Sequence, residues 1–183
     1  VSGISMGACL QALLSHSPAV EPMSPALASY WFEWHTALAF FSYAVFVVSA
    51  SIEAVCLIVK PFVKRGRHIY GLTANAIDEL QTTAFKLVAM GFPLLTFAVL
   101  SGAAWANEAW GKYWSWDPKE TWLLITWTVF AVYLHAKTIP ALRGCPAAIF
   151  NLIGFVCIMM MTFLGVNWLA RLLDIPSLHV SPL

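Results

Sequence analysis

The chain has 183 residues, of which 60% are hydrophobic and only 10% are charged, and its mean hydropathy is +0.75. Soluble domains usually carry about 25% charged residues, so this composition argues against an ordinary soluble domain and predicts a membrane protein. The formal net charge of +1 leaves no bulk basic surface of the kind that binds nucleic acids.

The cysteine pattern excludes two further classes of protein. The chain has four cysteines, and no two of them form a CxxC or CxxCH motif. The sequence therefore predicts neither a disulfide framework nor a c-type haem attached to this chain itself. The four stand far apart in the sequence, at Cys9, Cys56, Cys145 and Cys157.

The N-terminal region does not resemble a signal peptide. The chain opens with Val1 and has no charge through residue 20, whereas a signal peptide opens with Met and a basic segment. Its apolar stretch, residues 4–14, is too short to span a bilayer and is interpreted as the end of a truncated span. We expect a single membrane domain over residues 1–183, truncated or short at its N-terminus.

Four longer segments match the length of a membrane span. A bilayer core requires about 20 mostly apolar residues per helix. The third segment is shorter, but Lys137 at its end can extend it by snorkelling. The sequence therefore predicts an all-α, polytopic membrane helix bundle with four to five transmembrane helices. The four segments are residues 35–59, 87–106, 121–136 and 144–170. Residues 76–85 have helical periodicity and are expected to form a helical lead-in to the second segment.

Basic residues predict how the bundle is oriented. The sequence KPFVKRGRH connects the first two spans, and Lys137 and Arg143 connect the last two. Positive loops favour the cytoplasmic side of a bacterial membrane, or the stroma in a plastid. The opposite ends are then expected on the outer face. These ends are the segment before Trp31, the loop WGKYWSWDPKET and the tail after Arg171.

The five histidines fall into two groups. His16, His68 and His135 have ordinary interpretations as loop or helix-end residues. His35 and His179 are both predicted on the outer face, on either side of the aromatic loop. Two neutral imidazoles in that arrangement favour ligation of a haem iron, although an interfacial histidine without a ligand remains the alternative for each.

Tryptophan is concentrated in one part of the chain, where six of them fall within residues 105–127. A belt at the membrane interface accounts for one or two rings at the end of a span. It does not easily account for four aromatic residues in the connecting loop. We predict that the loop forms a flat aromatic surface suited to a haem, with lysines nearby for a propionate. The predicted cofactor-binding residues are Trp110, Lys112, Tyr113, Trp114, Trp116, Asp117 and Lys119.

The charges of this loop also have a local structural explanation. Asp117 is a strong N-cap residue, Pro118 suits the first helical position, and Glu120 completes a capping box. Asp117 and Glu120 are therefore expected to start the helix of the third span. This local role does not exclude contact between the loop and a ligand.

The residues WANEAWGKYWSWDPKETWLLITWTVFAVYLHAK, 105–137, closely resemble the tryptophan-rich "WWD" signature of haem-handling proteins. The DPKET ending and the following LITW and YLH resemble the CcsA family, also called ResC or CcsB, of System II cytochrome c biogenesis. The System I relatives CcmC and CcmF carry a different sequence after the WD. The resemblance includes PALASYWFEWHTALAFFSYAVF, GFPLLTFAVLSGAAWANEAWG and FLGVNWL, and it covers roughly residues 25–169.

The resemblance implies a function. Such proteins work with a ResB-type (Ccs1) membrane partner and present haem b to an apocytochrome c at the periplasmic or thylakoid-lumenal face. The haem vinyl groups then form thioethers with the CxxCH cysteines, so the complex is a holocytochrome c synthase (haem lyase). The WWD loop binds haem and two outer histidines ligate the iron. His35 matches the first, and His179 is the candidate for the second, in a context that differs from the family's GLHSY-like stretch.

Three alternatives remain from the sequence. A haem exporter or chaperone without ligation activity would carry the same loop. A structural membrane subunit would use its tryptophans only as an interface belt. An ion or proton pathway would use Glu53, although this residue is expected near the cytoplasmic end of its span, where it can snorkel or pair with Lys60.

Overall fold

The computed structural model describes residues 25–66 and 71–161, and the regular secondary structure of this part of the chain is all helical, without strands. It therefore confirms the predicted all-α class. The four α-helices are α2 (Tyr30–Lys64), α3 (Ala74–Trp110), α4 (Pro118–Thr138) and α5 (Cys145–Met159). The short 3₁₀ turn η1 (Pro25–Ala28) precedes α2, and a second one, η2 (Pro140–Leu142), follows α4.

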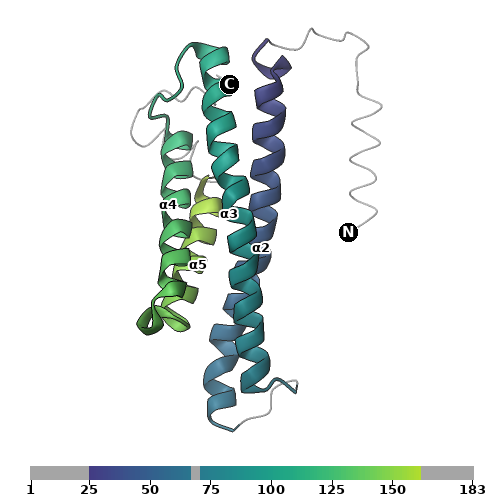
Figure 1. Cartoon of the computed structure of the whole chain (residues 1–183), viewed down its shortest axis with the longest axis vertical. Helices are drawn as coiled ribbons and strands as arrows, with labels where there is room; N and C mark the ends of the chain where they lie inside the picture. The colour runs from purple at the N-terminus through teal and green to yellow at the C-terminus, as the bar shows by residue number, and fades with distance from the viewer. Residues whose placement is uncertain (1–24, 67–70, 162–183) are drawn as a thin grey trace, which may run out of the picture.

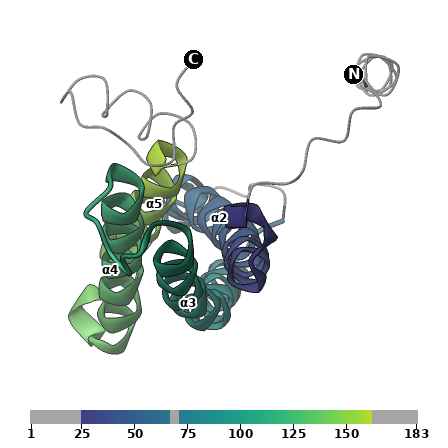
Figure 2. The ribbon, with the colours of Figure 1, turned by 90° about the horizontal axis from the view of Figure 1, so that it is seen from above.

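The helices form an up-and-down bundle. The chain reverses direction at each connection, so that α2 and α4 run one way and α3 and α5 the other (Figure 1). Seen from above, the neighbours around the bundle are α2 with α3, α3 with α4, α4 with α5, and α5 with α2 (Figure 2). The helices α2 and α4 are therefore diagonal partners, which only long side chains can connect.

The predicted spans coincide with these helices. Helices α2 and α3 have 35 and 37 residues, and they are the two described helices long and apolar enough to cross a bilayer. Residues 76–85 belong to α3, which confirms the predicted helical lead-in. Helix α5 is apolar and its described part has 15 residues, while residues 4–14 and 162–170 lie outside the described residues.

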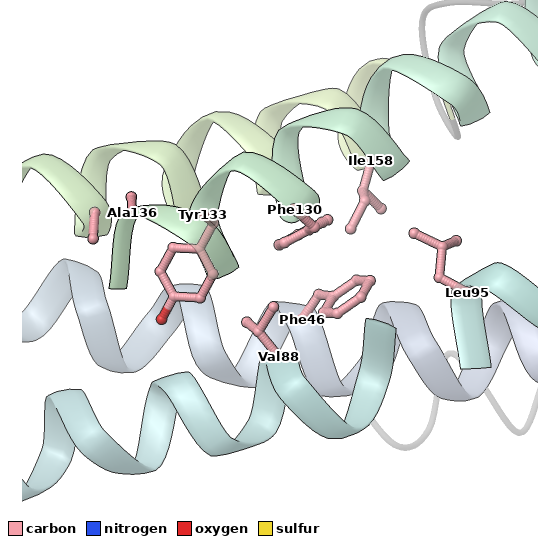
Figure 3. Close-up of a cluster of buried hydrophobic side chains, with 8 residues drawn as sticks. Phe46, Val88, Leu95, Phe130, Tyr133, Ala136 and Ile158 are labelled. Carbon is pink, nitrogen blue, oxygen red and sulfur yellow. The ribbon is translucent and has the colours of Figure 1, made fainter. Parts of the chain in front are cut away.

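Two glycines allow an aromatic pair to fill the centre of the bundle. Phe46 of α2 and Phe130 of α4 stack with ring centroids 3.9 Å apart, and both are fully buried (Figure 3). A Cβ atom on Gly91 would lie 2.7 Å from the Phe46 ring, and one on Gly154 would lie 2.7 Å from the Phe130 ring. Small residues let membrane helices approach closely, so these glycines set the spacing of α3 and α5 against the diagonal pair.

A buried ion pair forms the second link between α2 and α4. Lys137 Nζ lies 2.9 Å from Glu53 Oε1, and the Glu53 side chain has no exposed surface. Gln81 Nε2 and the Tyr133 hydroxyl also donate to this carboxylate, at 3.1 and 3.3 Å. The expectation that Glu53 snorkels or pairs with Lys60 is therefore wrong. Lys60 instead contacts Asp78 and Gln81.

The two ends of the bundle differ in chemistry. We call one the aromatic end, formed by the start of α2, the end of α3, the loop at residues 111–117 and the start of α4. We call the other the basic end, formed by the end of α2, the start of α3 and the segment from Lys137 to Gly144. At the basic end α2 and α3 extend past α4 and α5 (Figure 1).

Candidate functional site

A cavity of about 430 Å³ lies at the aromatic end, within the roughly 300–1,000 Å³ range of small-molecule sites. Helices α2, α3 and α4 and the loop between α3 and α4 all contribute to its wall. Most of its lining is apolar or aromatic, and a few polar groups converge on it. The lining residues used below are His35, Gly102, Trp105, Tyr113, Trp114, Lys119 and Glu120.

His35 is held in a defined orientation on this wall. Its Nδ1 lies 2.8 Å from the carbonyl oxygen of Ala98 in α3. A carbonyl only accepts, so Nδ1 donates, and in the neutral imidazole Nε2 then carries the lone pair. The ring also stacks on Trp105, with centroids 6.1 Å apart and an interplanar angle of 15°. A histidine whose second nitrogen is fixed by a carbonyl is the usual arrangement for a metal ligand.

Gly102 makes this position of His35 possible. It lies one helical turn after Ala98 on α3, and a Cβ atom there would be 2.6 Å from Nδ1 of His35. No real Cβ contact is that short, so any larger residue would displace the ring. The small side of α3 thus admits the imidazole against the helix backbone.

The loop folds back over the cavity because both of its ends are fixed. Gly111 adopts a left-handed conformation with φ 74° and ends α3, where its N–H donates to the carbonyl of Asn107. At the other end, Asp117 and Glu120 form the predicted capping box at the start of α4. Glu120 Oε2 also accepts from the backbone N–H of Ser115 at 2.8 Å. The carboxylate that caps the helix therefore also shapes the loop.

The aromatic rings at this end pack against one another in a chain. Phe32 of α2 contacts Trp105, with centroids 5.2 Å apart, and Trp110 packs edge-on against Trp105 at 5.0 Å. Trp114 and Trp116 form a second edge-on pair at 5.9 Å. Trp105 therefore contacts both His35 and Trp110, the last residue of α3, while the second pair lies within the loop itself.

Comparison with known proteins identifies the family. The sequence profile described as "Cytochrome C assembly protein" matches residues 1–173 of this chain. The chain belongs to the cytochrome c assembly protein family. Within it, the chain is 42% identical over 147 residues to the cytochrome c biogenesis protein CcsA of Chlamydomonas reinhardtii and 38% identical over 193 residues to that of Nymphaea alba. The CcsA of Guillardia theta is 36% identical over 167 residues. The predicted resemblance to CcsA is confirmed.

The alignments cover most of this chain but only part of each relative. The alignment with the Chlamydomonas reinhardtii protein includes 80% of this chain and 40% of that protein. The corresponding shares are 92% and 62% for Nymphaea alba, and 82% and 55% for Guillardia theta. The chain thus spans about half the length of these relatives. Family membership and the two long apolar helices identify an integral membrane protein.

The structure brings some of the predicted site residues together. His35, Tyr113, Trp114 and Lys119 line one cavity, although they come from α2, the loop and α4. The other predicted residues that the structure describes are not part of its lining. Trp110 packs edge-on against Trp105, and Lys112 and Trp116 are exposed. Asp117 is buried at the start of α4. His179 lies outside the described residues.

Sequence reasoning missed three residues that line this cavity. Trp105 was recognised only as one of several tryptophans, and Glu120 only as a capping residue. Gly102 was not singled out at all. The signal that could have found it is the run SGAA in α3, because small residues in a membrane helix mark a close approach.

The donors on the cavity wall are compatible with a haem. No cluster of three or more potential metal-ligating side chains occurs within residues 25–66 and 71–161. A haem iron requires only axial ligands from the protein, because the macrocycle supplies the other four nitrogens. One oriented imidazole, aromatic walls and the ammonium of Lys119 therefore match this group better than a bare metal ion.

Replacement of Trp116 by glycine is expected to raise the free energy of unfolding by about 1 kcal/mol. Trp116 is the one described residue other than glycine with a positive φ, 59°, a conformation that is strained for a bulky residue. Its side chain is 68% exposed, so little packing is lost. Chemical unfolding of both proteins in detergent, followed by circular dichroism, measures the change.

The contrasting variant is Trp114→Gly. Trp114 is half-buried, lines the cavity and has an ordinary φ, so its removal should lower stability. An equal loss of stability in both variants would contradict the strain at Trp116.

Proposed function

We propose that this chain holds haem b at its aromatic end and presents it for covalent attachment to an apocytochrome c. The single observation that carries the proposal is His35, fixed by Ala98 so that Nε2 has the lone pair, on the wall of a cavity bordered by the tryptophan-rich loop. The relatives named above are cytochrome c biogenesis proteins, which supports a role in cytochrome c maturation.

Five of the lining residues have a role in this proposal. His35 would bind the iron through Nε2. Trp105 stacks on the imidazole of His35 and holds the plane of that ring. Tyr113 and Trp114 lie against the macrocycle, and Lys119 pairs with a propionate. His179 remains the proposed second ligand, and it lies outside the described residues.

The attachment reaction requires mainly position from this protein. Addition of a thiol across a vinyl double bond forms one carbon–sulfur bond and places the thiol hydrogen on the other vinyl carbon, so no oxidant is consumed. The chain's contribution is to exclude water and to fix the haem plane, so that both vinyl groups face the incoming CxxCH cysteines. The histidine of CxxCH then replaces one of the protein's axial ligands.

The proposal includes a side of the membrane and a partner. The basic end carries the loops that favour the inner side, so the aromatic end faces the periplasm or the thylakoid lumen, where c-type cytochromes are assembled. A ResB-type (Ccs1) membrane protein is the proposed partner.

The Soret spectrum of the purified chain tests the ligand assignment. His35→Ala should lose most of the haem absorbance of the wild type, and added imidazole should restore it by filling the space left by the side chain. His135→Ala is the matched control, since His135 is also a helical histidine whose Nδ1 contacts a carbonyl, that of Ala131 at 2.9 Å, but it lies on α4 near the basic end. A spectrum unchanged in His35→Ala would refute the assignment.

A second experiment separates haem attachment from simple haem transfer. The chain is expressed with a ResB-type partner and an apocytochrome c, and covalent haem is detected on a denaturing gel. Covalent cytochrome that disappears with His35→Ala supports the proposed synthase. Haem-loaded protein without covalent product would favour the haem-chaperone alternative.

A further inference from the structure

A second cavity, of about 420 Å³, lies at the basic end of the bundle. It opens where α3 begins, α4 ends and α5 begins. Three of its side chains are cationic and one is anionic, whereas the aromatic-end cavity contains one of each. The lining residues are Lys60, Asp78, Gln81, Thr82, Phe85, Lys137, Arg143 and Gly144.

The charges of this basic pocket do not cancel. Lys60 pairs with Asp78 at 3.4 Å, and Lys137 pairs with the buried Glu53 at 2.9 Å. Arg143 has no carboxylate at salt-bridge distance within the described part of the chain. Its guanidinium donates to the carbonyl oxygens of Lys137 and Thr138, at 2.9 and 3.2 Å, which fixes it at the end of α4 with further N–H donors remaining.

The start of α5 adds to this positive potential. Gly144 precedes the helix with φ 92°, and no side chain caps the first turn. The first N–H groups of a helix have no partner within it, and the helix dipole places partial positive charge there. Because Pro146 has no N–H, these groups at α5 are those of Gly144, Cys145 and Ala147. A fixed guanidinium and an uncapped helix N-terminus thus border the same pocket, an arrangement that suits a phosphate group.

We propose that the basic pocket binds the phosphate group of an anionic phospholipid. Lys60, Arg143 and the N-terminus of α5 would contact the phosphate, and the Thr82 hydroxyl, which donates to the carbonyl of Asp78, would accept a hydrogen bond from the rest of the headgroup. This inference does not depend on the haem site, which lies at the other end of the bundle.

A lipid is favoured over a free phosphate ion because of where the pocket lies. It is formed by the ends of membrane helices, and Phe85 gives it an apolar wall. Helix α5, which begins at the pocket, has an exposed apolar stripe of Ile149, Ile153 and Val156. Basic pockets between membrane helices at the inner side commonly bind anionic headgroups, while acyl chains follow the adjacent helix surface.

Native mass spectrometry of the full chain in neutral detergent tests the proposal. Phosphatidylglycerol should bind the wild type, and phosphatidylcholine should bind much more weakly. Arg143→Gln should weaken phosphatidylglycerol binding about fivefold, the effect of one basic residue near an anionic surface. Lys60→Gln is a second variant, because Arg143 also binds the end of α4 and its replacement can affect folding.

The control variant is Lys64→Gln, which removes an exposed charge at the same end but outside the pocket. It should bind phosphatidylglycerol like the wild type. Equal losses in all three variants would overturn the pocket in favour of a diffuse surface charge. Equal binding of the two lipids would also overturn the proposal, and so would displacement of phosphatidylglycerol by inorganic phosphate at the same concentration.

Discussion

Gly102→Ala is expected to lower the affinity of the chain for haem roughly ten- to a hundredfold, the usual effect of disturbing the group that orients a metal ligand. The new methyl group would lie 2.6 Å from Nδ1 of His35, so the ring must leave Ala98 and Trp105. Helix propensity alone favours alanine by about 1 kcal/mol, so a loss of folding is not expected. Haem titration followed at the Soret band measures the affinity.

The double variant His35→Ala/Gly102→Ala shows whether the effect passes through the imidazole. Without that ring the methyl group has nothing to displace, so Gly102→Ala should add no further loss to His35→Ala. Residues that act through one contact show such non-additivity. Additive losses would mean that Gly102 acts through another part of the cavity.

Lys137→Met is expected to lower the free energy of unfolding by about 3–5 kcal/mol, because it leaves the Glu53 carboxylate buried without its cation. The double variant Glu53→Gln/Lys137→Met removes both charges and should recover much of that loss. Unfolding in mixed detergent micelles, followed by circular dichroism, measures all three proteins. A double variant no more stable than Lys137→Met would contradict the ion pair as the cause.

Lys60→Met provides the matched control for this pair. Lys60 lies at the same end of the bundle, but its partner Asp78 is 70% exposed and 3.4 Å away. An exposed pair of this kind contributes about 0–1 kcal/mol. The difference between the two lysine variants therefore measures the effect of burial.

The buried pair also bears on the candidate site at the other end. His35 precedes Glu53 on α2 by 18 residues, and Lys119 precedes Lys137 on α4 by the same 18 residues. Both helices run in one direction, and each residue advances about 1.5 Å along the axis. The Glu53–Lys137 pair and the level of His35 and Lys119 are thus separated by the same rise along both helices.

Local features of the fold were predictable from the sequence. Hydropathy located the helices, and the spacing of Asp117, Pro118 and Glu120 predicted the start of α4, where the structure has the capping box. These features depend on residues a few positions apart. The resemblance of the tryptophan-rich loop to the CcsA signature was also contained in one continuous stretch.

Contacts between helices were not predictable in the same way. Glu53 was expected near Lys60, which is two turns away on the same helix, but it pairs with Lys137 on the diagonal helix. Lys112 and Lys119 were equivalent in the sequence, yet only Lys119 lines the cavity. The first outcome depends on how each helix is rotated about its axis, and the second on how the loop at residues 111–117 folds. A single sequence specifies neither.

The class of protein, the positions of the helices and the start of α4 are encoded by composition or by neighbours along the chain, and so is the candidacy of His35 and the aromatic loop. The shared cavity of His35, Trp105 and Lys119, and the space that Gly102 leaves for the imidazole, are visible only in the folded bundle. They depend on how the helices pack. Small residues fix how closely and at what rotation the helices meet, and that geometry selects which side chains face one another.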